Sequence, residues 1–150
     1  MAPRLSLGEL FVEVSKTIKH ADKIELLHQY SALPLWYLLK LAYNDVKWDI
    51  PEGKPPIKEW KGRPGSASSE LSRECRRMYM FIEQCEPGLK RIRREKLFQD
   101  MLEGLEPPEP DVLVAIKDKT FEKTYHLPRK VVEAAFPGLL DLNFVPRFIR

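Results

Sequence analysis

Residues 33–43 read LPLWYLLKLAY, and their apolar side chains fall on one side of a helix. Pro34 suits the first turn, because the backbone N–H that proline lacks has no partner at that position. Helical spacing relates four apolar residues: Leu35, Leu38, Leu39 and Ala42. This stretch therefore predicts a helix over 33–43 whose apolar stripe faces a core.

The same periodicity recurs on both sides of this stretch. It predicts six further helices, over residues 5–16, 21–29, 70–84, 89–104, 109–117 and 127–136. Ser6 and Glu9 have the spacing of a capping box at the start of the first of them. Proline and glycine mark the turns between helices. The sequence thus predicts one all-α domain over residues 1–150, an irregular bundle of about seven helices.

Four segments fall outside these helices. Residues 46–50 alternate apolar and polar side chains and predict a short extended segment. Residues 51–68 are rich in proline and glycine and predict a long irregular loop, pinned to the body at Trp60. Residues 118–126 predict a polar, basic loop. The apolar tail 139–150 has two interpretations: it packs across the domain, or it reaches a partner.

The composition excludes several classes of protein. The chain has 150 residues, 43% of them hydrophobic and 31% charged, so it can build one core and is not disordered by composition. No apolar run approaches the roughly 20 residues of a membrane-spanning helix, and the amphipathic start does not resemble a signal peptide. In a helix, Cys75 and Cys85 would lie about 15 Å apart, too far for a disulfide. We therefore expect a cytoplasmic protein with reduced thiols and no membrane partner.

The residue types that carry chemistry form no recognisable centre. The sequence has no glycine-rich phosphate loop and no nucleophile elbow. His20, His28 and His126 lack the spacing of metal ligands, and neither cysteine has a second ligand close in sequence. The sequence therefore predicts no catalytic residue, no metal site and no small-molecule cofactor. It indicates a protein that is not an enzyme.

The net charge of +3 is small, but the positive residues are clustered. One cluster runs from Arg73 to Lys96 and a second from Lys117 to Lys130. Two interpretations stay open. The clusters are ordinary solvated helix faces, or they form a surface that contacts phosphate groups, built from Lys and Arg near helix ends.

Three stretches resemble a known domain, the N-terminal all-α DNA-binding domain of phage-type ATP-dependent DNA ligases. Residues 23–54, KIELLHQYSALPLWYLLKLAYNDVKWDIPEGK, resemble its start, and residues 112–140, VLVAIKDKTFEKTYHLPRKVVEAAFPGLL, resemble its end. Residues 70–84 resemble its long central helix. Phe136-Pro137-Gly138-Leu139 matches its closing signature. The resemblance covers most of residues 5–140 and implies the same fold and contact with DNA.

The chain is also similar to a family of tailed-phage proteins of about this length. The shared segments are residues 48–56, 115–119 and 135–139. Together the two resemblances imply a stand-alone version of the ligase domain in a phage, and hence the host cell cytoplasm as its location. The sequence lacks the K-x-D-G motif whose lysine takes the adenylyl group, so ligation by this chain alone is excluded. His126 stands where the ligases tend to have a glycine.

The leading prediction is non-catalytic binding of duplex DNA through its phosphate backbone, as a phage accessory protein. The candidate DNA-binding residues around the last loop are Lys117, Lys119, Lys123, His126, Arg129 and Lys130. A second candidate patch comprises Lys90, Arg91 and Arg94. The competing prediction is a protein-interaction module that docks a phage or host protein through the loop 51–68 and the tail 139–150.

Overall fold

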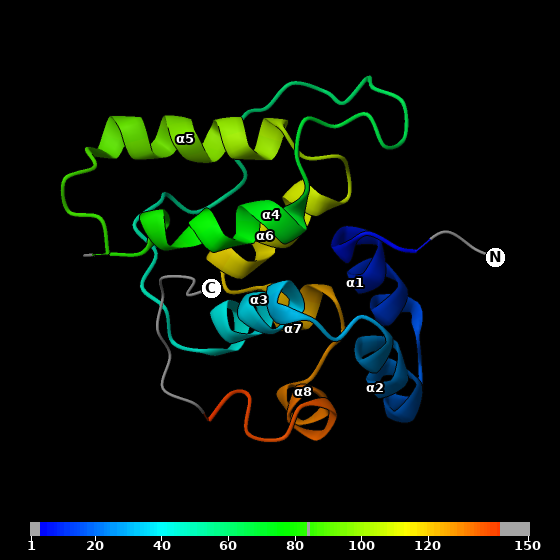
Figure 1. The fold of residues 1–150 in the computed structure, drawn as a ribbon. Helices are drawn as coiled ribbons and strands as arrows, with labels where there is room; N and C mark the ends of the chain where they lie inside the picture. The colour runs from blue at the N-terminus through cyan, green and yellow to red at the C-terminus, as the bar shows by residue number, and fades with distance from the viewer. Residues whose placement is uncertain (1–3, 84, 142–150) are drawn as a thin grey trace.

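The computed structural model describes residues 4–83 and 85–141, which fold as an assembly of helices (Figure 1). These are α1 (Leu7–Lys16), α2 (His20–Gln29), α3 (Leu33–Tyr43), α4 (Leu71–Glu74), the 3₁₀ helix η1 (Cys75–Phe81), α5 (Arg91–Glu103), α6 (Glu109–Lys117), α7 (Phe121–Thr124) and α8 (Arg129–Ala135). The described residues contain no β-strand, only an isolated bridge between Trp48 and Ile82. The predicted all-α class is confirmed.

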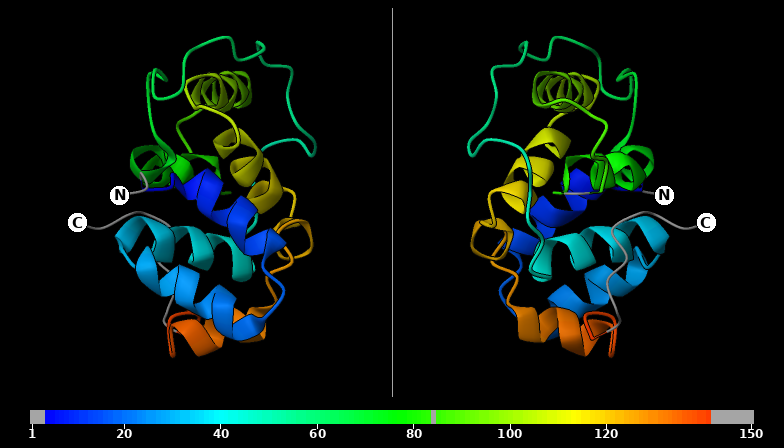
Figure 2. Two further views of the ribbon diagram at one scale, coloured as in Figure 1. Left: turned by 90° about the vertical axis from the view of Figure 1, so that its right-hand side faces the viewer. Right: turned by 90° about the vertical axis from the view of Figure 1, so that its left-hand side faces the viewer.

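Helix α3 lies at the centre of the fold, and its leucines Leu35, Leu38 and Leu39 are completely buried. It packs against α4, η1, α6 and α7. In Figure 1, α5 lies along the upper edge of the molecule and α8 along the lower edge, with α3 and α6 between them. The two views of Figure 2 show the same order. The predicted helix over 33–43 and its buried stripe are therefore confirmed, and α5 and α8 mark opposite ends of the molecule.

Helix α1 begins with the predicted capping box. The Ser6 hydroxyl accepts a hydrogen bond from the Glu9 backbone N–H at 3.1 Å, and the Glu9 carboxylate accepts one from the Ser6 backbone N–H at 2.9 Å. In the first turn of the helix, Gly8 is in close contact with Glu109 at the start of α6. A Cβ at Gly8 would lie 2.8 Å from the Glu109 nitrogen. Only glycine lets α1 and α6 approach this closely.

The prediction of one continuous α-helix over 70–84 is wrong. The chain makes the short α4 and then η1, and Ile82 is extended. The N–H of Asp49 donates to the Phe81 carbonyl at 2.7 Å, and the N–H of Glu83 donates to the Lys47 carbonyl at 2.8 Å. The predicted extended segment 46–50 thus pairs with the end of η1 and terminates it. The buried residues of η1 recur every third position, the period of a 3₁₀ helix: Cys75, Met78 and Phe81.

Helix α5 buries the apolar side chains of its later turns, Phe98, Met101 and Leu102, but its first turn departs from an apolar pattern. Ile92 is 84% exposed although it is apolar, whereas Arg94, a candidate DNA-binding residue, is buried on the same face as Phe98 and Leu102. The guanidinium of Arg94 forms an ion pair with Asp49 at 2.9 Å and donates to the Leu89 carbonyl at 2.6 Å. These partners compensate for removing the charge from water, so that the arginine can occupy a core position.

The loop 51–68 is irregular, as predicted, and side chains from α5, α6 and the turn between them hold its backbone along its length. The Lys117 ammonium donates to the carbonyls of Pro51, at 2.8 Å, and Gly53, at 3.0 Å. Further along, the loop is fixed by bonds from the Gln99 amide to the Pro56 carbonyl, from the Lys58 N–H to Glu103 and from the Gly65 N–H to Glu106. The loop therefore follows a defined path over the body.

The basic loop predicted over 118–126 contains a helix, α7, and this is a second correction. Phe121 and Tyr125 are one helical turn apart and both are buried. Their rings meet at 5.0 Å, and Phe121 also packs edge-on against Phe11, at 5.0 Å, and Tyr43, at 5.8 Å. Burial of this aromatic cluster folds a segment whose other residues are polar.

The apolar tail predicted over 139–150 is described only as far as residue 141, and residues 142–150 lie outside the described part of the chain. Leu139 is half-buried and Leu140 is buried against the core. The start of the tail therefore packs on the domain, and the choice between the two interpretations of the tail rests on residues outside the described part.

Candidate functional site

A shallow depression of about 530 Å³ lies where the start of α2 meets the segment from α7 to α8. Three lysines and two histidines line it against a single carboxylate: His20, Lys23, Lys119, Glu122, Lys123, His126, Leu127 and Pro128. We call this the basic depression. It is a concave surface of positive charge, and it is formed from two parts of the chain far apart in sequence.

Two consecutive turns of the same type shape its wall. Helix α6 ends in a Schellman motif, in which the Thr120 N–H donates to the Ala115 carbonyl and the Lys119 N–H to the Ile116 carbonyl. Helix α7 ends in the same motif, with the Leu127 N–H bonded to the Glu122 carbonyl and the His126 N–H to the Lys123 carbonyl.

Each motif places its residue just past the helix in the left-handed region, Lys119 at φ 59° and His126 at φ 49°. Glycine is the usual residue at this position, because a Cβ is strained there. Both positions are instead occupied by a basic or titratable side chain, and both side chains line the depression. Backbone strain of this kind concentrates at functional sites, which directs attention to these two residues.

Hydrogen bonds from α2 and α3 hold the chain beneath the depression. The Lys23 ammonium donates to the His126 carbonyl, and the Tyr43 hydroxyl donates to the Leu127 carbonyl. Burial raises the pKa of Tyr43 above its usual range, so the hydroxyl keeps its proton and remains a donor. The Arg129 guanidinium in turn donates to the Tyr43 carbonyl at 2.7 Å. The backbone carbonyls of His126 and Leu127 are thus held from two helices.

The outer cations of the depression are accessible. Lys119 forms an ion pair with Asp45 at 3.1 Å, in which both side chains are more than half exposed. Such a pair contributes about 0–1 kcal/mol, so an incoming anion can displace it. Lys123 is exposed and has no ion-pair partner in the described part of the chain. Lys119 and Lys123 are therefore available to bind a negatively charged group.

Most of the residues predicted around the last loop fall in or beside this depression. Lys119, Lys123 and His126 line it, and Arg129 and Lys130 are exposed on the first turn of α8, directly after Pro128. Lys117 is a correction. Its side chain is 1% exposed, it is bonded to the loop 51–68 and to Asp118, and its ammonium lies 5.9 Å from the Phe98 ring centroid. It is a structural residue and does not reach the surface.

The second predicted patch is smaller than expected. Arg94 is buried and paired with Asp49, which removes it from the surface. Lys90 and Arg91 are exposed, and Arg91 pairs with Glu95 at 3.2 Å. This end of α5 lies across the molecule from α8, so the structure does not join the two patches into one surface (Figures 1 and 2).

His20 and Lys23 belong to the depression, although the sequence assigned neither of them a functional role. Helix α2, which carries both residues, has no side-chain cap at its N-terminus. His20 and Lys23 reach the depression because α2 packs against α8, and no local sequence pattern predicts this long-range contact. In the sequence, this contact is hinted at only by the position of Lys23, which falls on the apolar side of α2 next to Ile24 and Leu27.

Comparison with known proteins places the chain in a family. The model of DUF6433, a family of unknown function, matches residues 10–123. The chain belongs to this family. The matched range runs from within α1 to α7 and includes Lys119 and Lys123. No curated protein and no solved structure matches the chain.

Two further observations concern other kinds of site. Within residues 4–83 and 85–141, no group of three or more His, Cys, Asp or Glu side chains is arranged to hold a metal ion. None of the helices in the same residues has the length and apolar character needed to cross a membrane.

Proposed function

We propose that this DUF6433 protein binds duplex DNA without catalysing a reaction, by contacting backbone phosphates at the basic depression. The observation that carries the proposal is the convergence of Lys119, Lys123 and His126 with the start of α2 around one concave surface. Cations spaced over such a surface neutralise several phosphates at once and fix the protein on the duplex without reading its sequence.

The electrostatics of the depression support a polyanion as the ligand. Its single carboxylate, Glu122, is outnumbered by lysines, and the uncapped N-terminus of α2 adds a partial positive charge. Lys130, also exposed on α8, extends the positive surface beyond the rim. The left-handed backbone at Lys119 and His126 supports the same conclusion, because strain retained at basic residues is expected where their position serves binding.

The biological setting is proposed from the resemblance described above. The likeness of residues 23–54 and 112–140 to the ligase DNA-binding domain favours DNA over other polyanions. The similarity to tailed-phage proteins favours a phage accessory protein that acts in the host cell cytoplasm. In this proposal the protein positions or protects DNA and leaves the chemistry to other enzymes.

Fluorescence anisotropy with labelled intact and nicked duplexes, over a series of salt concentrations, tests the proposal. We expect affinity to fall steeply as salt rises, with a slope of about −0.9 per phosphate neutralised. The double variant Lys119→Glu/Lys123→Glu should lose most of this affinity. Lys47→Glu/Arg76→Glu is the matched control, because it changes the net charge equally at exposed positions outside the depression. Equal losses in both variants would refute the depression as the binding site.

The competing function is a protein-interaction module. The observation in its favour is the loop 51–68, which the body holds in one conformation with Trp60 half-buried at a pocket. This function becomes the stronger proposal if the wild-type protein does not bind duplex DNA even at low salt. Retention of a phage or host protein by the wild type, and its loss in a Trp60→Ala variant, would then support it.

A further inference from the structure

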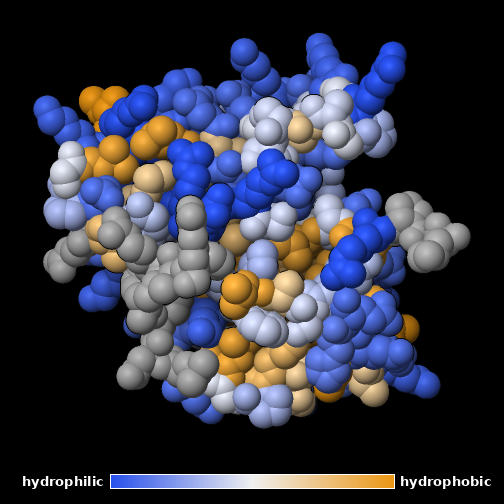
Figure 3. Space-filling model, in the orientation of Figure 1, coloured by the Kyte–Doolittle hydropathy of each residue, from blue (hydrophilic) through white to orange (hydrophobic). Residues whose placement is uncertain are grey.

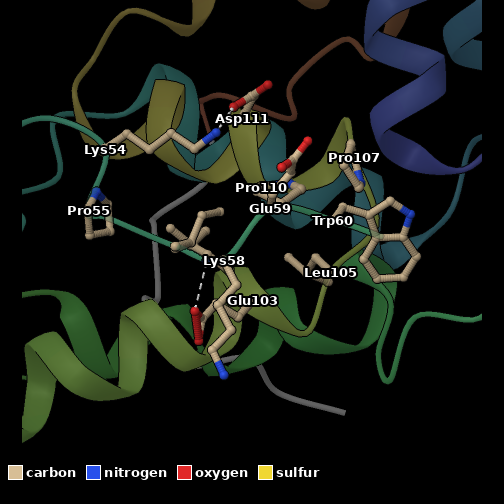
Figure 4. A pocket seen from close by; sticks show the side chains of 12 residues that line it. Lys54, Pro55, Lys58, Glu59, Trp60, Glu103, Leu105, Pro107, Pro110 and Asp111 are labelled. Carbon is tan, nitrogen blue, oxygen red and sulfur yellow. Dashed lines mark hydrogen bonds and ion pairs between the residues drawn. The ribbon is translucent and has the colours of Figure 1, made fainter. Parts of the chain in front are cut away.

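A second site lies between the loop 51–68 and helices α5 and α6 (Figure 4). It is a pocket of about 380 Å³, within the range of pockets that hold small organic groups. Trp60 closes one end of it beside Leu105 and Pro107, and Lys54 and Pro55 lie at the other end. An aromatic ring therefore forms one wall of an open pocket.

The loop holds the Trp60 ring in a fixed place. A Cβ at Gly62 would lie 2.7 Å from the ring carbon Cζ2, so the glycine backbone packs directly against the indole. On either side of the tryptophan, the loop is bonded to the body, through the Lys58 N–H to Glu103 at 3.0 Å and the Gly65 N–H to Glu106 at 3.0 Å. The ring is half-buried, so one part is supported by protein and the rest is accessible.

Three cations lie within three positions of Trp60 along the chain. Lys58, Lys61 and Arg63 are exposed, and no carboxylate in the described residues forms an ion pair with any of them. Three carboxylates line the pocket. Asp111 is paired with Lys54 at 2.9 Å and Glu103 accepts a hydrogen bond from the Lys58 N–H, whereas Glu59 is exposed beside Trp60. In Figure 3, long hydrophilic side chains project from the upper edge of the molecule, where Figure 1 shows this loop.

We propose that this site binds single-stranded nucleic acid, with an unpaired base stacked on Trp60. Lys58, Lys61 and Arg63 would neutralise the phosphates on either side of that base. Proteins that hold single strands without sequence preference combine these two elements, a basic path for the backbone and an aromatic ring for the bases. The proposal extends the function beyond duplex binding and does not rest on the basic depression, which is lined by different residues.

The test compares a labelled twelve-nucleotide single strand with a strand of the same length and charge that lacks its bases. Binding is measured by fluorescence anisotropy, with both DNA and RNA versions, to Trp60→Ala, Trp60→Phe and the wild type. We expect the wild type to prefer the strand with bases by about fivefold or more, which is the effect of stacking one base. Trp60→Ala should lose this preference and Trp60→Phe should keep part of it. We expect the preference for strands with bases to be the same for DNA and RNA, since every base can stack.

Two results would overturn the proposal. The first is equal affinity of the wild type for strands with and without bases, which would show attraction by charge alone. The second is an unchanged preference in a folded Trp60→Ala protein, which would place the base elsewhere. The variant Lys119→Glu/Lys123→Glu separates the two proposals, because it should weaken duplex binding and leave the preference for bases intact.

Discussion

The Lys23 ammonium donates a hydrogen bond to the carbonyl oxygen of His126, a residue in the left-handed conformation at the end of α7. This bond joins helix α2 to a turn more than a hundred positions later in the chain. Lys23 is buried, so the bond forms largely out of water. It fixes the carbonyl of a residue whose side chain lines the basic depression, and it thereby links the stability of the fold to the shape of the site.

Removing this bond should destabilise the protein. In Lys23→Met the apolar part of the side chain remains, but the His126 carbonyl loses its donor. We expect the free energy of unfolding to fall by about 1–3 kcal/mol, the usual effect of leaving a buried polar group without a partner. Urea unfolding measures the change. Lys16→Met, an exposed position in the last turn of α1, is the control. If both variants unfold at the same urea concentration, the bond makes no contribution.

Lys119→Gly should have opposite effects on stability and on binding. Glycine adopts φ 59° without strain, so the Schellman turn after α6 should become more stable by up to about 1 kcal/mol. The same change removes a cation from the basic depression, so duplex affinity should fall and the salt slope should decrease by about one phosphate. Thermal unfolding and anisotropy give the two readouts.

Lys119→Ala, which removes the charge but keeps a Cβ, should weaken binding without gaining stability. A Lys119→Gly protein that binds DNA as tightly as the wild type would contradict the proposed role.

Lys117→Met should destabilise the protein by about 3–5 kcal/mol, the range measured when one partner of a buried ion pair is removed. The substitution would free the carbonyls of Pro51 and Gly53 and leave Asp118 without its cation. Below the unfolding transition, duplex affinity should be close to that of the wild type, because Lys117 does not reach the surface.

Lys123→Met is the matched comparison for this prediction. Lys123 is exposed, so its loss should change stability by no more than about 0.5 kcal/mol while weakening DNA binding. Urea unfolding and anisotropy on both variants test the assignment. It fails if Lys117→Met lowers affinity in the folded protein as much as Lys123→Met does.

Glu109 should make stability depend on pH. Burial raises the pKa of its carboxyl above the ordinary value of 4.5, against hydrogen bonds from the N–H groups of Leu71 and Gly8. The folded protein therefore holds this proton more tightly than the unfolded chain. The stabilising contribution is fully present below about pH 4.5 and is lost as pH rises through the folded pKa.

Glu109→Gln removes this titration and keeps the shape of the side chain. The free energy of unfolding of the wild type, minus that of the variant, should decline as pH rises above about 4.5 and through the folded pKa. Urea unfolding at a series of pH values measures this difference. For the control Glu25→Gln, at an exposed position on α2, the difference should not change with pH. If the difference for Glu109→Gln is also independent of pH, the Glu109 carboxyl has the same pKa in the folded and unfolded states.

Local patterns predicted the helices whose apolar residues lie on one side, and they failed where a distant segment decides the conformation. Residues 33–43 carry their own signal and form α3 as expected. Residues 70–84 carry an equally clear signal, but Asp49 and Lys47 pair with the end of that segment and stop the helix. The loop 118–126 looked polar because only Phe121 and Tyr125 are apolar in it, and those two suffice to bury α7.

The candidate site was predictable in part. Its exposed lysines stand out as a cluster in the sequence, but charge alone does not distinguish a surface cation from a buried one. Lys117 and Lys119 are two positions apart, and one is buried while the other is exposed, because the Schellman turn between α6 and α7 reverses the direction of the chain. His20 was missed because it reaches the site from another helix.

The sequence by itself determined the helical class, the capping of α1, the irregular loop 51–68 and the clustering of positive charge, since each follows from side chains within a few positions of one another. The tertiary structure alone decided which cations share a surface. It brought α2 against the turn before α8, and it used Lys117, Lys23 and Arg94 as buried donors to backbone carbonyls. The physical reason is that burial and hydrogen bonding depend on contacts between distant segments, and these set whether a charged side chain binds its own chain or remains free for a partner.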